Sequence, residues 1–79
     1  MTAINRNQMV KTMEHVLEGQ MARHRINIEV LLDRGVGVAE HPDIMDTIEK
    51  ELGMMSEYAD KLAMLEIVKS GKLSNGKSF

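Results

Sequence analysis

Glu57 and Asp60 are the residue pair with the clearest potential for chemistry, two carboxylates three positions apart in a segment rich in helix-forming residues. On a helix this spacing places both on one face, and carboxylate oxygens are the ligands that Mg²⁺ and Mn²⁺ prefer. Glu14 and Glu18 do not repeat the spacing, being four positions apart. Because Glu57 and Asp60 could bind a metal ion together with an acidic residue of another helix, a metal-dependent hydrolase built from bundled copies is an alternative. We prefer a solvated helix face, which Lys61 supports by following Glu57 after four positions.

His24 occupies a position in the apolar pattern of its segment where leucine would be expected. A histidine there could act as a pH switch or bind a ligand, because its charged form is costly to bury. The preferred interpretation is a half-buried imidazole bonded to Gln20 or Asn27, one turn away on either side. His15 lies nine residues earlier, at the wrong angle to share a metal ion with His24.

The middle of the chain, residues 35–43, combines two glycines with Glu40, His41 and Asp43. Such a segment could hold an anion at a helix start or gather three side chains about a metal. We prefer a structural explanation, in which the glycines permit a chain reversal and Pro42 begins a helix whose dipole Asp43 complements. We therefore predict no catalytic, cofactor-binding or metal-binding residues, no cofactor, and no enzymatic activity.

Composition excludes several classes of function. The chain has 79 residues and no cysteine, which excludes a disulfide framework, a zinc ribbon, an iron–sulfur site and a thiol nucleophile. The formal net charge is -2, and Tyr58 and Phe79 are the only aromatic rings. Binding to nucleic acid needs a clustered basic surface and rings on which bases can stack. An RNA-binding hairpin dimer is thus only a second alternative.

No apolar run approaches the roughly 18 residues that a membrane-spanning helix requires. The first eight residues are polar and do not form a basic stretch before an apolar run. We therefore expect a soluble, cytoplasmic protein without membrane association.

Helix-forming residues fill both sides of the middle segment and predict an all-α fold. Asn5 and Gln8 form the pattern of a capping box, which predicts a helix over about 6–33. A second helix is predicted over about 42–69, before Ser70 and Gly71. Residues 1–70 would then form an antiparallel two-helix hairpin, and residues 71–79, with Gly, Ser, Asn and Lys, a flexible tail.

Apolar residues recur at steps of three and four along both helices and predict two facing stripes, as in a coiled coil. Antiparallel pairing would place His24 near Leu52 and Leu17 near Ala59. A chain this short buries too little surface alone, so we expect homodimerisation into a four-helix bundle. The predicted oligomer seam consists of Met13, Leu17, Met21, His24, Ile28, Met45, Ile48, Leu52, Met55 and Leu62.

Apolar residues outside this seam still need to be covered, and they predict a protein partner. The chain has eight methionines, which suit adaptable contact surfaces. Gly19 and Gly53 lie inside the helices, where a close helix approach would justify their cost of about 1 kcal/mol each. The predicted partner surface consists of Met54, Tyr58, Met64, Leu65, Ile67 and Val68.

Two segments, residues 37–44 (GVAEHPDI) and 57–62 (EYADKL), resemble short helical proteins of unassigned activity that are encoded by T4-like phages of marine cyanobacteria. The resemblance extends over most of residues 10–68 and carries no catalytic motif. It implies a phage accessory protein acting on a host or phage protein. Together with the helical pattern, it favours a small non-enzymatic protein that acts by protein–protein binding.

Overall fold

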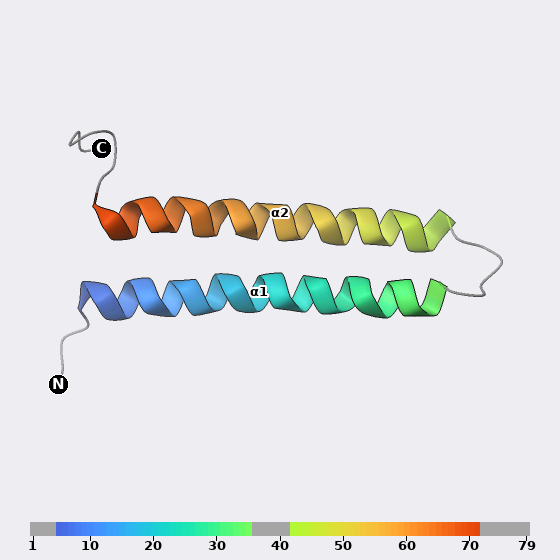
Figure 1. Ribbon diagram of the computed structural model, residues 1–79, viewed down its shortest axis with the longest axis horizontal. Helices are drawn as coiled ribbons and strands as arrows, with labels where there is room; N and C mark the ends of the chain where they lie inside the picture. Colours follow the sequence, from blue (N-terminus) through green and yellow to red (C-terminus); the bar gives the residue numbers. More distant parts are fainter. Residues whose placement is uncertain (1–4, 36–41, 72–79) are drawn as a thin grey trace.

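The computed structural model describes residues 5–35 and 42–71, and within them the chain forms an all-α helical hairpin, as predicted. Helix α1 (Arg6–Gly35) and helix α2 (Pro42–Ser70) lie side by side and run antiparallel (Figure 1). Both helices extend slightly beyond the predicted ranges of 6–33 and 42–69. The predicted tail beyond Gly71 lies outside the described residues, as do residues 36–41 between the helices.

Side-chain and backbone caps define the helix ends. The Asn5 Oδ1 atom accepts a 2.8 Å hydrogen bond from the backbone N–H of Gln8. In return, Gln8 Oε1 accepts a 3.2 Å hydrogen bond from the backbone N–H of Asn5. This reciprocal pair is the predicted capping box. Gly71 closes α2 with a φ of 70°, a left-handed conformation, and its amide donates to the Val68 carbonyl.

The seam between the helices follows a regular alternation of three- and four-residue steps on each helix. It contains both buried residues, Leu17 and His24, and a set of half-buried neighbours. On α1 the seam consists of Val10, Glu14, Leu17, Met21, His24, Ile28 and Leu31. On α2 it consists of Ile44, Ile48, Glu51, Met55, Tyr58, Leu62 and Leu65.

The stripe of α2 residues predicted to face α1 differs in part from the one that does. Met45 and Leu52 were expected to face α1, but they are 61% and 52% exposed. On α1, Met13 is 47% exposed, and Glu14 occupies the position expected for it. The physical reason is polar pairing: α2 turns so that Glu51 meets His24. Contacts of Met13, Met45 and Leu52 with another chain remain a prediction.

The hairpin is a single layer of helices with both faces open, only 13 Å across its thinnest dimension. Among the described residues, Leu17, at 6% exposure, is the one buried apolar side chain, whereas twelve large apolar side chains are exposed. The fold therefore leaves many large apolar side chains in water.

Neither described helix is long and apolar enough to cross a membrane.

Gly19 and Gly53 do not mark a close approach between the two helices. A Cβ atom added at either position would meet nothing within 4 Å. Contact between α1 and α2 therefore does not explain these glycines.

Replacing Gly53 with alanine should stabilise the protein by up to about 1 kcal/mol, because alanine restricts the unfolded chain and fits the open space. Chemical denaturation followed by circular dichroism would measure the change, with Ala63→Gly as a matched control expected to lose a similar amount. A loss of stability in Gly53→Ala would contradict the open surface described here.

Candidate functional site

A cluster of polar side chains lies at the centre of the otherwise apolar seam. His24 on α1 is only 5% exposed, and its Nδ1 atom donates a 2.7 Å hydrogen bond to Glu51 Oε1 on α2. The Asn27 amide donates to the same oxygen over 3.0 Å. The Arg23 guanidinium lies 3.4 Å from His24 Nε2 and can donate to it. This arrangement suits a neutral imidazole that carries its hydrogen on Nδ1.

Tyr58 covers one face of the His24 ring. The two rings stack with centroids 5.9 Å apart and an angle of 19° between their planes. The Lys61 ammonium lies 5.1 Å from the centre of the same tyrosine ring. Tyr58 and Leu65, which were expected on the partner surface, are both half-buried in the seam. Within one chain their role is therefore internal packing.

The partner of His24 is on the opposite helix, and not one turn away on its own helix as expected. Gln20 makes no hydrogen bond to His24 among the described contacts, and Asn27 reaches the shared carboxylate instead. A signal for this pairing is present in the sequence. Glu51 interrupts the apolar pattern of α2 at nearly the level where His24 interrupts that of α1. Two interruptions at one level indicate a polar pair, because each satisfies the other's buried hydrogen-bonding groups.

The surroundings of Glu51 favour its charged form. The hydrogen bond from His24 is the main cause that lowers the pKa of the Glu51 carboxyl, and the bond from Asn27 lowers it further. Partial burial opposes this effect without overcoming it. The carboxylate is therefore ionised at neutral pH and serves as a fixed acceptor between the helices.

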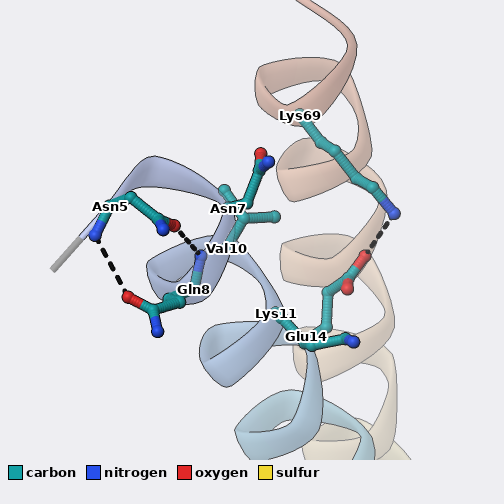
Figure 2. A pocket seen from close by; sticks show the side chains of 7 residues that line it. All are labelled: Asn5, Asn7, Gln8, Val10, Lys11, Glu14 and Lys69. Carbon is teal, nitrogen blue, oxygen red and sulfur yellow. Dashed lines mark hydrogen bonds and ion pairs between the residues drawn. The ribbon is translucent and has the colours of Figure 1, made fainter.

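A second set of polar contacts joins the two helices where α1 begins and α2 ends, which we call the open end of the hairpin. Lys69 Nζ donates to Glu14 Oε2 over 3.0 Å, and Figure 2 shows this pair joining the two helices. The bond from Lys69 lowers the pKa of Glu14, and the bond to Glu14 raises that of Lys69. Nearby, the Arg6 guanidinium donates to the Val68 carbonyl over 2.6 Å, where a cation complements the helix dipole.

Beside this ion pair lies a pocket at the start of α1 (Figure 2). Its carboxylate, Glu14, is already neutralised by Lys69, and Asn5 and Gln8 are engaged in the capping box. Glu14 and Lys69 therefore join the two helices, and Asn5 and Gln8 cap the start of α1. The lining consists of Asn5, Asn7, Gln8, Val10, Lys11, Glu14 and Lys69.

The structure places the acidic pair Glu57 and Asp60 on exposed surface. Glu57 Oε1 lies 3.8 Å from Lys61 Nζ, which is the expected pairing along one helix. Among the residues that the structure describes, no three His, Asp or Glu side chains gather where they could hold a metal ion. Glu40 and His41, the other candidate ligands, lie outside the described residues.

Exposed apolar side chains gather beside the seam on one side of the hairpin. Met13 lies seven residues, or two helical turns, after Arg6, and so shares its side of α1. Arg6 bonds to the Val68 carbonyl, which brings this side of α1 next to the side of α2 that carries Val68. We call this surface the methionine flank. From the seven-residue period of the seam, we assign to it the exposed residues Met9, Met13, Val16, Val30, Met54, Met64 and Val68.

The opposite flank carries fewer large apolar residues. Leu32, Met45 and Leu52 are exposed there, and charged Glu18 and Arg25 line a hollow on the same side. Of the expected partner surface, Met54, Met64 and Val68 therefore belong to the methionine flank, while Ile67 is exposed on the outer side of α2.

Comparisons of the chain with protein-family models, with curated proteins and with solved structures give no match.

Stability should decrease in acid as Glu51 is protonated. Its pKa is lowered in the folded state, so the unfolded chain binds protons more readily, and the contribution of Glu51 is lost as pH falls below the ordinary value of 4.5. The free energy of unfolding should therefore differ between the wild type and Glu51→Gln at neutral pH and converge in acid. Denaturant titrations across the pH range would measure this, with Glu14→Gln as a comparison. A difference that stays constant with pH would contradict the assignment.

Removing one partner of the His24–Glu51 pair should cost more than removing both. His24→Leu leaves the carboxylate without its main donor, and Glu51→Leu leaves a buried imidazole nitrogen unpaired. The double substitution restores an apolar seam, which is often neutral or stabilising. A double-mutant cycle by chemical denaturation should show a combined loss smaller than the sum of the single losses. Additive losses would mean that the pair is not coupled.

Proposed function

We propose that this chain is a small non-enzymatic interaction protein that associates with a second copy of itself to form a four-helix bundle. The observation that supports this most directly is the lack of an interior. One apolar side chain is buried among the described residues, and twelve large ones are exposed. Two copies stacked face to face would convert exposed flank into core, because each single-layer hairpin provides one side of a two-layer bundle.

The available surface suits such an interface. A stable interface covers about 800 Å² on each partner. Among the described residues, twelve large apolar side chains are exposed and could contribute to such an interface. Apolar area removed from water contributes about 25 cal/mol per Å² before the costs of association are subtracted. The many exposed methionines favour binding to proteins, since their flexible side chains adapt to a partner's shape.

The proposal includes a cytoplasmic location and a role as a phage accessory protein that binds a host or phage protein. The resemblance of residues 57–62, together with 37–44, to the cyanophage proteins supports this part. In a dimer, the side of each hairpin that does not contact the second copy would be available to such a partner.

Light scattering coupled to size exclusion tests the self-association. We expect a mass near twice 8.9 kDa that persists on dilution through the micromolar range, because the apolar surface drives association. Circular dichroism on the same fractions would report whether the chain is folded. A helical, folded species with the mass of one chain at every concentration would contradict the proposal.

A further inference from the structure

We infer that the second copy binds on the methionine flank and that the two hairpins point in the same direction, with their open ends together. This inference rests on the proposed self-association and adds its face and its orientation. It follows from where the exposed apolar residues lie along the hairpin, and from the charges among them.

The contacts within the hairpin show which residues lie at the same level along its axis. Arg6 meets the Val68 carbonyl, and His24 meets Glu51. Because the helices are antiparallel, each step forward along α1 corresponds to one step back along α2. Met13 and Met64 are thus within about one turn of the same level.

The apolar residues of the methionine flank gather toward the open end of the hairpin. Met9, Met13 and Val16 lie in the first half of α1, and Met64 and Val68 lie in the last turns of α2. In Figure 1 both of these segments lie at the left end, where α1 begins and α2 ends. The other end of this flank is more polar and carries Asn27, Arg34, Thr47 and Lys50 beside Val30.

A symmetric dimer in which both copies contact each other through the methionine flank can have its two-fold axis parallel to the helices or perpendicular to them. With the axis along the helices, α1 packs on α2 of the second copy and the two open ends coincide. Met13 then meets the second copy's Met64, and Met9 meets its Val68. With the axis across the helices, Met64 instead faces the polar end, near Thr47 and Lys50. The first arrangement buries more apolar surface for the same contact area.

Charges favour the same choice. With the axis across the helices, α2 packs on its own copy, so that Lys61 approaches Lys50 and Glu57 approaches its own counterpart. Like charges held together in an interface are destabilising. With the axis along the helices, Arg34 lies within about a turn of the second copy's Asp43, an opposite charge. Arg23 lies closer to the level of the second copy's Lys50 than to that of its Glu57, so one like-charge contact remains. This arrangement avoids the pairing of Lys61 with Lys50.

The second copy is the preferred occupant of this flank because the surface complements itself. Its apolar half would cover an equal apolar half, and Arg34 would lie near the second copy's Asp43, which carries the opposite charge. The opposite flank offers only Leu32, Met45 and Leu52 as large apolar residues, next to exposed Glu18 and Arg25.

Cysteine cross-linking tests this inference directly, since the chain has no cysteine of its own. Met13→Cys, Met64→Cys, Val30→Cys and Leu52→Cys all change exposed side chains. Each variant is prepared with a distinguishable tag and oxidised in pairwise mixtures. Mass spectrometry then measures the mixed disulfide, which forms only between side chains a few ångströms apart. We expect Met13→Cys with Met64→Cys to cross-link several-fold more than any other pair.

Dominant cross-linking of Met13→Cys with Val30→Cys would overturn the orientation. Dominant cross-linking through Leu52→Cys would overturn the choice of flank. Either result would leave the proposed dimer intact. Light scattering on the wild type and the reduced variants distinguishes these two results from failure of the proposed self-association. If all of them are monomeric, both the self-association and this inference are overturned.

Met64→Asp provides a second measurement that does not depend on disulfide geometry. A charge buried in the interface should shift the dimer toward monomer and lower the midpoint of thermal unfolding, because Met64 is exposed on the methionine flank and the hairpin depends on the second copy for stability. Leu52→Asp, on the opposite flank, is the matched control and should remain dimeric. The reverse pattern would overturn the choice of flank.

Discussion

Two helices can share only one seam, and this constraint governs the whole molecule. A helix in a larger domain is covered on several sides, whereas each helix here has one neighbour within the chain. The hairpin therefore remains one layer, 13 Å across its thinnest dimension, with its other helix faces in water. Packing between the helices produces one buried apolar residue, Leu17, among those described. The remaining apolar surface is thus open to contacts with another chain.

Within that single seam, specific polar contacts determine how the helices fit together. Apolar residues alone would tolerate rotation or sliding of α2, since methionine and isoleucine pack in several ways. The His24–Glu51 bond and the Glu14–Lys69 ion pair fix both the rotation and the level. Buried polar groups that must find each other are known to set register in paired helices. This pairing also leaves Met9, Met13, Met45, Met54 and Met64 exposed outside the seam, where they are open to contacts between chains.

Sequence reasoning was reliable for local features and less so for the rotation of α2. The capping box, the helices and the hairpin follow from local rules that involve residues a few positions apart. The seam of α2 required a choice between two overlapping stripes that share Ile48, Met55 and Leu62. Hydrophobicity favoured the stripe with Leu52, whereas the structure uses the one with Glu51, because a charged residue is acceptable in a seam only when it has a partner. That partner is on the other helix, and periodicity within one helix does not reveal it.

We propose that the hairpin obtains a large part of its stability from association with a second copy. Association makes the midpoint of thermal unfolding depend on protein concentration, and circular dichroism over a wide concentration range would measure this dependence. We expect the midpoint to rise steadily as the protein is concentrated. A midpoint that stays the same at all concentrations, with a fully helical chain, would contradict it.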